Sequence, residues 1–414
     1  MSWQKSQTVY TIFFLFALAA HDLACCAQQS RDEKTNWYKG NLHTHSLWSD
    51  GNDFPEMIAK WYKDHGYHFL GISDHNILSK GVKWMPKSAI EKRGGKGGPQ
   101  RYEKVFGENW VVKRTSKGTV DYLLKPLHEF RSLFEEPEKF LMIQSEEITD
   151  HFGSLPIHIN ATNLEDLIKP QGGQDVRETM ANNLRAIKRQ QERIGRPIFA
   201  HVNHPNFGWA ITAEDMAAVK EEKFFEIYNG HPGVRQLGDP DHPSLEKMWD
   251  IANTLRIEKM KIDPLFGIAT DDAHNYFGTT GASVGRGWVM VAANRLTASS
   301  IVNSLEAGNF YASSGVRIES FGFDSKNKKY WLKIQPQDGV EFKTEFIGTK
   351  KQTVSQSSQK IGITLYASQD LSPSYQFKDD DLYVRVRVTS SQSHPNPSIK
   401  RQRQQAWLQP IWLK

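Results

Sequence analysis

Over its first three quarters the chain alternates short apolar runs with amphipathic stretches of helical period. The run GNLHTH at 40–45 precedes the helical pattern FPEMIAKWYKDHG, and YHFLGIS follows. The same alternation returns through KFLMIQSEEIT, LPIHIN, RPIFAHV, FFEIYNG and PLFGIAT, with a long helical pattern over 175–194. Apolar runs of this kind predict buried parallel strands covered by helices. We therefore expect an α/β domain over residues 36–315, with its chemistry at the strand C-termini.

The pattern changes near residue 315. From Ser320 onward apolar and polar residues alternate, as in KKYWLKIQP, FKTEFIG, KIGITLYAS and DDLYVRVRV, and long helical periods disappear. This predicts a small β-sandwich over residues 316–414. The basic tract before the last apolar run is expected to form a solvated hairpin.

The N-terminus carries one apolar run at 9–20, VYTIFFLFALAA, behind Lys5 and before a stretch of small residues. The run is shorter than the roughly 20 residues of a membrane-spanning helix, so it predicts a signal peptide over 1–27 and export to the periplasm or the exterior. Cleavage before Cys25 would leave a lipid anchor instead of a free end. The alternative is a buried N-terminal helix.

Composition narrows the chemistry. The 52 Lys and Arg against 47 Asp and Glu give a net charge of +5, too small to indicate a nucleic-acid partner. The two cysteines, Cys25 and Cys26, both lie in the predicted leader region, so a metal site further along must use the 15 histidines and the carboxylates.

One segment, about 80–118, is strongly basic. It holds eleven Lys and Arg against Glu91, Glu103 and Glu108, and it contains the sequence GGKGG. We expect either a mobile insertion over the mouth of the site that attracts an anionic substrate, or a solvated, partly disordered loop.

Residues that commonly bind metals lie at the ends of the predicted strands. His43 and His45 are two apart, so on a strand both point to one face, and Asp50 follows them. The motif GISDHN ends the next run with Asp74 and His75. Later runs end with a further set of candidates: Glu146, Glu147, His158, His204, Asp272 and His274.

Imidazole and carboxylate together suit zinc, manganese or iron, and several carboxylates can hold one to three ions close together. Such ions generate a bound hydroxide at neutral pH and bind the oxygen of the electrophile, which is hydrolase chemistry. The chain has no nucleophile elbow, GxxxxGK loop or GxGxxG fingerprint that would indicate another reaction.

The motifs HxH, Asp-Gly, SDH, Glu-Ile-Thr, His-Ile-Asn, NHP and TDDAH, in this order, resemble the PHP superfamily, named for polymerase and histidinol phosphatase domains. More narrowly they resemble its carbaryl-hydrolase-like branch, and GNFYASSG at 308–315 is similar to the closing motif of that branch. The resemblance covers roughly 40–315. It implies a distorted β/α barrel, usually seven-stranded, with one to three metal ions at the strand C-termini.

The resemblance also implies roles for single residues. His43, His45 and Asp272 would bind one ion, and Glu147, which precedes the Ile-Thr pair, would bridge ions. His158 and His204 would complete a second site. The third would use His75, His274 and Asp50, although many relatives have a histidine at the last position.

Several neighbours stay open. His201 competes with His204 as a ligand, and the His-Pro pair favours His204. His231, after FFEIYNG, can donate to a substrate oxygen or protonate a leaving group, or can simply support the site together with Glu226 and Asn229. Asp74 is expected to orient a ligand histidine. The candidate catalytic residues are Asp272, His231 and Asp74.

These features favour an exported metal-dependent phosphoesterase that acts on a small anionic substrate. The alternative within the same chemistry is a carbamate, ester or amide hydrolase, for which aromatic residues such as Phe207, Trp209 and Phe277 would line an apolar pocket. A nucleic-acid substrate is less favoured, since the strands lack interleaved basic and aromatic positions. From another class, the chain would be a non-catalytic binding module that retains metal.

Overall fold

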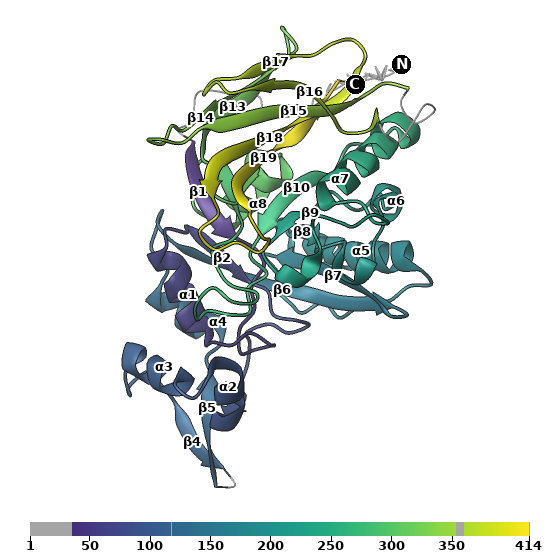
Figure 1. Ribbon diagram of the computed structural model, residues 1–414. Coiled ribbons are helices and arrows are strands. Elements are labelled where there is room, and N and C mark those ends of the chain that lie inside the picture. The colour runs from purple at the N-terminus through teal and green to yellow at the C-terminus, as the bar shows by residue number, and fades with distance from the viewer. Residues whose placement is uncertain (1–34, 117, 353–359, 414) are drawn as a thin grey trace, which may run out of the picture.

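The computed structural model describes residues 35–116, 118–352 and 360–413. The predicted signal peptide and Cys25 lie outside these residues. The chain forms a mixed α/β structure built on one 13-stranded sheet, with strand order β10-β9-β8-β7-β6-β2-β1-β11-β12-β19-β18-β15-β16 (Figure 1). The predicted α/β class is confirmed. The seven-stranded barrel remains a prediction.

The N-terminal half of the sheet is partly parallel. Strands β1 (Asn36–Asn41), β2 (Phe69–Ile72) and β6 (Leu141–Phe152) run parallel, with helix α1 (Pro55–Asp64) between the first two. Strand β7 (Leu155–Thr162) is antiparallel to β6, which departs from the parallel sheet predicted for this half. Only Gly153 and Ser154 separate these two strands, and so short a link allows a hairpin but no crossover helix.

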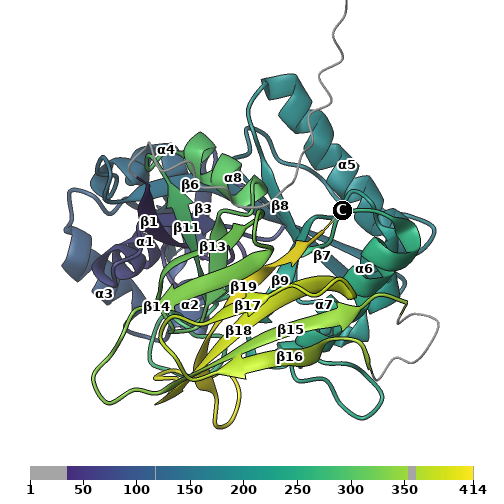
Figure 2. The same cartoon turned by 90° about the horizontal axis from the view of Figure 1, so that it is seen from above.

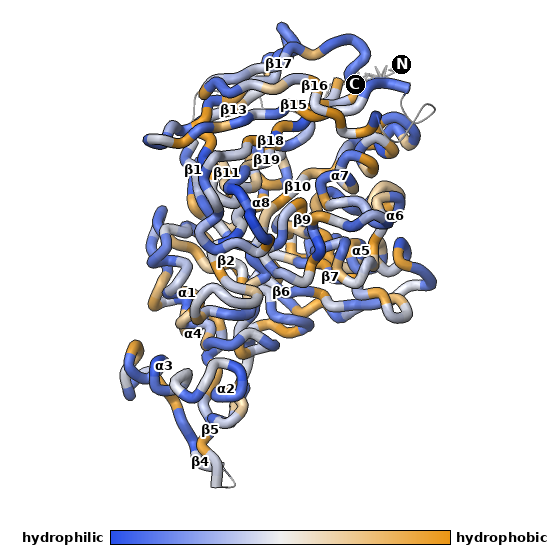
Figure 3. Tube along the Cα trace, in the orientation of Figure 1, coloured by the Kyte–Doolittle hydropathy of each residue, from blue (hydrophilic) through white to orange (hydrophobic). Residues whose placement is uncertain are grey.

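The remaining strands of this half continue from β7. They are β8 (Phe199–Val202), β9 (Phe224–Asn229) and β10 (Phe266–Thr270), and β8, β9 and β10 run parallel. Their connections contain the helices α5 (Val176–Ile194), α6 (Ala213–Ala218) and α7 (Leu245–Thr254), the short turns η2 (Phe207–Trp209) and η3 (Pro232–Val234), and the π-helix η4 (Leu255–Met260). Figure 3 shows apolar segments where these strands meet the helices, and the buried core there includes Met180, Phe225 and Trp249.

The sheet continues across the predicted domain boundary near residue 315. Strands β11 (Trp288–Ala293) and β12 (Phe310–Ser313), joined by α8 (Ala298–Glu306), pair with β1 and with the C-terminal β19 (Arg403–Trp412). Beyond β19 lie β18 (Asp381–Ser393), β15 (Phe342–Lys350) and β16 (Ile363–Ser368). The C-terminal region is β-rich as predicted, but its main strands belong to the same sheet as the N-terminal half.

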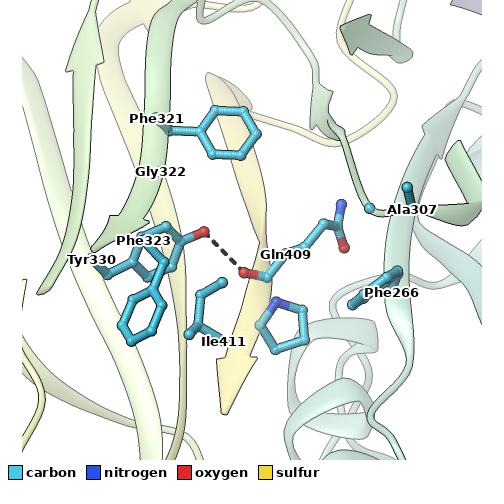
Figure 4. Close-up of a pocket in the computed structure, with 10 residues that line it drawn as sticks. Phe266, Ala307, Phe321, Gly322, Phe323, Tyr330, Gln409 and Ile411 are labelled. Carbon is cyan, nitrogen blue, oxygen red and sulfur yellow. Dashed lines mark hydrogen bonds between the residues drawn. The ribbon is translucent and has the colours of Figure 1, made fainter. Parts of the chain in front are cut away.

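A second sheet of three strands covers β15, β18 and β19. It consists of β13 (Ile318–Asp324), β14 (Lys329–Ile334) and β17 (Ser374–Gln376), and Figure 2 shows it along these strands. Tyr330 and Phe346 belong to the apolar core between them. A small cavity lies where this sheet meets β10 and β19, and Tyr330 Oη donates across it to Gln409 O at 2.9 Å (Figure 4). None of the predicted ligands lines that cavity.

The basic segment is a folded lobe, not a mobile or disordered loop as predicted. It contains β3 (Lys83–Pro86), α2 (Lys87–Gly94), α3 (Gly98–Phe106), β4 (Lys113–Ser116) and β5 (Thr119–Leu124), and it projects from the body in Figure 1. The short α4 (Leu127–Phe130) and η1 (Arg131–Leu133) follow it. The lobe folds because Ile90, Tyr102 and Tyr122 bury their side chains against Phe54 of the body.

A buried ion pair joins the C-terminal strands to the helical layer. Arg385 of β18 donates through Nε and Nη2 to the Asp250 carboxylate of α7, at 2.8 and 2.7 Å. Both side chains are almost fully buried.

Among the described residues, no helix combines the length and apolarity needed to cross a membrane.

Candidate metal centre

The nine predicted ligands converge at one edge of the sheet. His43 and His45 follow β1, His75 follows β2, His204 follows β8, and Asp272 and His274 follow β10, while Glu147 and His158 lie within the β6–β7 hairpin. All nine fall in overlapping groups of three or four whose ligand atoms lie within 4.8 Å of one another. Because strands β1, β2, β8 and β10 end here in the same sense, residues far apart in sequence meet.

Glu147 lies at the middle of this cluster and is fully buried. Its Oε1 lies 3.0 Å from His158 Nδ1 and 3.5 Å from His204 Nε2. Its Oε2 lies 2.9 Å from His75 Nδ1 and 3.4 Å from the Nε2 atoms of both His43 and His45. The two carboxylate oxygens therefore face two different sets of histidines, which is the arrangement a bridging carboxylate needs.

Asp272 closes the deepest part of the cluster. Its Oδ1 lies 3.3 Å from His43 Nε2 and 3.2 Å from His45 Nε2. The residue has a backbone φ of +47°, which is uncommon for residues other than glycine. Its backbone N–H donates to His43 O at 2.9 Å. This bond locks the two strand ends together and holds the carboxylate against the His-x-His pair.

The outer part of the cluster contains Asp50, His75 and His274 around His45. The His45 ring stacks against the rings of both His75 and His274, at centroid distances of 4.4 and 4.1 Å. Asp50 Oδ2 lies 3.5 Å from His75 Nε2 and 3.4 Å from His274 Nε2. The Asp50 side chain is 52% exposed, so the cluster opens to solvent at this end.

The donor atoms fit divalent ions. Among the described residues, His43 Nε2, His45 Nδ1 and Nε2, Glu147 Oε2 and His158 Nδ1 are buried without a hydrogen-bond partner. Buried polar atoms normally have partners, and a concentration of orphans on imidazoles and a carboxylate indicates that another group satisfies them. Nitrogen and carboxylate donors suit zinc, manganese or iron.

Burial and the neighbouring charges set the protonation states of Glu147 and His45. Burial raises the pKa of Glu147, but His75, His43 and His158 outweigh it and hold that pKa well below its usual range. Burial, with the nearby His274, lowers the pKa of His45 to about 3. Glu147 is therefore a carboxylate and His45 a neutral imidazole at neutral pH, the forms that bind metal.

Beneath the cluster, Glu226 of β9 organises two of the ligands. Its Oε1 accepts from His43 Nδ1 and Thr270 Oγ1, both at 2.6 Å, and its Oε2 accepts from the backbone N–H of His204 at 2.9 Å and from Asn229 Nδ2 at 2.7 Å. Four donors thus converge on one buried carboxylate. Because His43 Nδ1 is used here, its Nε2 is free to face Glu147 and Asp272.

The His201 and His204 alternatives occupy different places. His204 Nε2 faces Glu147, as predicted for a ligand, whereas His201 Nε2 lies 3.6 Å from Glu226 Oε1 in the layer below. His201 is fully buried and neither ring nitrogen has a hydrogen-bond partner among the described residues. His43, His201 and Glu226 form a further group of metal-type donors.

Glu146 and Asp74 point away from the cluster. The carboxylate of Glu146 accepts from Ile168 N–H at 3.1 Å, and burial raises its pKa to about 8. Asp74 was expected to orient a ligand histidine, but its hydrogen bonds go to the backbone and hydroxyl groups of Ser46 and Ser49. It therefore holds the loop between His45 and Asp50, and its buried position leaves it no direct access to a substrate.

His231 lies at the edge of the centre, with its ring 5.6 Å from that of His274. Gly233 N–H donates to His231 Nδ1 at 3.0 Å, so a neutral ring carries its proton on Nε2. Burial lowers the pKa of His231, which favours that neutral form.

Sequence reasoning missed the role of Asn203, and it placed Glu226 only as a general support of the site. Asn203 Nδ2 donates to Glu147 Oε1 at 2.7 Å, and Glu226 holds His43 as described. The available signal was position, because each lies on or just after a strand that ends in a ligand type. That signal does not distinguish a supporting residue from a ligand.

No family model and no curated protein match this chain. Among the solved structures that align with it are the following two. A two-domain protein containing a predicted PHP-like metal-dependent phosphoesterase, from Bacteroides vulgatus ATCC 8482, aligns over 91% of this chain and 95% of its own length, with 15% identity and a TM-score of 0.40. A protein proposed to be a metal-dependent phosphoesterase, from Bifidobacterium adolescentis ATCC 15703, aligns over 60% and 92%, with 11% identity and a TM-score of 0.29. These similarities are too low to assign a family or an activity to this chain.

Proposed function

We propose that the chain is a metal-dependent phosphoesterase of the PHP superfamily, with Glu147 bridging two of its metal sites. The observation that carries the proposal is the position of the Glu147 carboxylate, whose two oxygens face separate sets of buried histidines. The unpartnered buried nitrogens around it support the same assignment.

The residues divide into three sets that would hold one to three ions. His43, His45 and Asp272 form the first. The second consists of His158 and His204, which both face Glu147 Oε1. His75, His274 and Asp50 form the third, to which His45 also turns a nitrogen. Bound ions would activate a water molecule and polarise the phosphoryl oxygen.

Two side chains around this cluster would position the site and contact the leaving group. Asp74, through Ser46 and Ser49, holds the loop that carries Asp50 at the solvent edge. His231 presents an Nε2 proton beside His274, and it would donate to the leaving-group oxygen.

The basic lobe supports an anionic substrate. Lys83 Nζ donates to Trp48 O and Arg93 Nη1 to Ser49 O, so two cations sit on the residues just before Asp50. Neither forms an ion pair with a described carboxylate, unlike Lys113 and Arg114 of the same lobe, which pair with Glu103 and Asp121. Their unneutralised charge would attract a small phosphoester toward the solvent edge of the cluster.

Metal analysis paired with three model substrates tests the proposal. The purified protein should hold one to three equivalents of zinc, manganese or iron and hydrolyse p-nitrophenyl phosphate or its bis ester. Asp272→Asn should lose metal and turnover, while Asp338→Asn, an exposed aspartate in the C-terminal region, should keep both. Turnover of p-nitrophenyl acetate alone would favour the carbamate or ester hydrolase of the carbaryl-hydrolase-like branch. A protein that holds metal but hydrolyses none of the three substrates would favour the non-catalytic binding module, and a protein without metal would contradict the proposal.

The proposed export concerns residues outside the described structure. N-terminal sequencing of the mature protein from its native host tests it. An N-terminus after Ala27 supports a signal peptide, a lipid-modified Cys25 supports anchoring, and an intact Met1 contradicts both.

A further inference from the structure

The turn that follows His204 is held rigidly. Phe207 N–H donates to His204 O at 2.8 Å, and Trp209 N–H donates to Asn206 O at 3.1 Å. The buried Asn206 side chain donates to Arg235 O at 3.2 Å and to Pro243 O at 3.0 Å, which ties the turn to the next loop. The direction of Phe207 is therefore set by the backbone.

The conformation of this turn is a demanding one. Gly208 has φ +63°, and a Cβ there would lie 3.1 Å from Pro156 Cδ, so glycine is favoured by both torsion and space. Trp209 has φ +55° and stacks on His242 at 4.0 Å with the planes 5° apart. Strained backbone persists where the surrounding contacts over-determine it, and such positions cluster at functional sites.

The result is an aromatic ring at the edge of the metal cluster. The centroid of Phe207 lies 5.2 Å from the His204 ring and 6.2 Å from the His158 ring. Phe207 and His231 also approach Gly233 together. A Cβ added to Gly233 would lie 4.0 Å from Phe207 Cε2 and 2.9 Å from His231 Cε1. Phe207 thus stands next to two proposed ligands and on the same side as His231, the proposed hydrogen-bond donor.

Phe207 keeps 36% of its surface exposed. Single exposed apolar residues are common, so exposure alone indicates nothing. Here the exposed ring borders the cluster between His158, His204 and His231, where a leaving group that accepts a hydrogen bond from His231 would lie. The Phe207 ring in that place would increase the binding free energy of a substrate by packing against an apolar group of it.

We propose that Phe207 is a specificity-determining residue that packs against an aromatic leaving group, so that the preferred substrates are aryl phosphoesters. The proposal rests on the proposed function. It also separates this protein from phosphoesterases for small polar alcohols, because a polar leaving group would gain nothing from this face.

The test compares phenyl phosphate with methyl phosphate. Intrinsic reactivity cancels when the ratio of kcat/KM for the two substrates is compared between variants. Phe207→Ala should lower the phenyl-to-methyl ratio about tenfold, whereas Phe207→Trp should retain it. Phe152→Ala is the matched control, since Phe152 at the tip of the β6–β7 hairpin is also 36% exposed, and it should keep the wild-type ratio.

A binding measurement makes the inference independent of turnover. Calorimetric titration with phenylphosphonate and methylphosphonate should show the same aryl preference in the wild type and its loss in Phe207→Ala. Phe207→Leu, which keeps an apolar side chain, serves if the alanine variant does not fold, and it should lose part of the preference. An equal fall for both ligands, or no aryl preference in the wild type, overturns the inference. Aryl preference in binding without hydrolysis of either ester overturns the proposed function, and with it the aryl phosphoester as substrate, and leaves only the aryl contact of Phe207.

Discussion

Replacing Glu226 by glutamine should weaken metal binding without removing any proposed ligand. Each oxygen of the Glu226 carboxylate accepts from two donors, and the glutamine amide can supply only one acceptor oxygen. Its NH₂ group must therefore face two of those donors, whichever way the amide turns.

The two orientations have different consequences. With the NH₂ group at the Oε1 position, His43 can avoid a clash only by moving its proton to Nε2, the atom that faces Glu147 and Asp272. With the NH₂ group at the Oε2 position, it meets the backbone N–H of His204, which cannot rearrange. Either outcome disturbs a proposed ligand, and losses of this kind typically lower metal affinity about 10- to 100-fold. That corresponds to about 1.4–2.7 kcal/mol.

Chelator competition at pH 7.5 with zinc or manganese measures the apparent Kd. Glu222→Gln is the matched control, because Glu222 is also buried, lies four residues earlier, and has no hydrogen-bond partner for either carboxylate oxygen among the described residues. The control should bind metal as the wild type does. The reasoning is refuted if Glu226→Gln retains the wild-type affinity, or if both variants lose affinity equally, since that would indicate a general loss of stability.

Three further predictions concern other parts of the structure. Burial raises the pKa of Glu56 to about 7, so its contribution to stability is complete below the unfolded pKa of about 4.3 and is lost as pH rises toward 7. The free energy of urea unfolding should therefore fall between pH 5 and 7, and Glu56→Gln should make that fall smaller. An unchanged slope in the variant would contradict this. Arg385→Ala leaves Asp250 buried without its cation and should lower the free energy of unfolding by about 3–5 kcal/mol. The comparison is Arg177→Ala, because the Arg177 side chain is 51% exposed in its ion pair with Asp215. The double variant Lys83→Gln, Arg93→Gln should reduce kcat/KM for p-nitrophenyl phosphate and weaken its dependence on salt, and an unchanged salt dependence would exclude a role in substrate attraction.

The sequence predicted much of the cluster because its signals are local. The two-residue period of a strand puts His43 and His45 on one face, and the apolar runs before Asp272 and His204 mark strands whose ends converge. The same alternation separates Glu147 from Glu146, whose carboxylate bonds Ile168 on the other face.

Long-range pairing could not be predicted in this way. Strand β19 joins β12 by pairing Tyr311 with Leu408, and nothing near either residue specifies that partner, so the sequence does not predict that the C-terminal strands extend the N-terminal sheet. The lobe was misjudged because its charge and glycines dominate its composition, whereas the contacts of Tyr102 and Tyr122 with Phe54 that fold it lie far apart in the sequence. The role of Glu226 depends on which donors surround it, and sequence spacing does not contain that information.

Anomalous diffraction from crystals grown with manganese tests the central claim most directly. The account predicts at least two anomalous peaks, one on each side of the Glu147 carboxylate, with His43, His45 and Asp272 around one and His158 and His204 around the other. Glu147→Gln crystals should lose at least one of these peaks. Saturating manganese with no peak at this carboxylate would contradict the account.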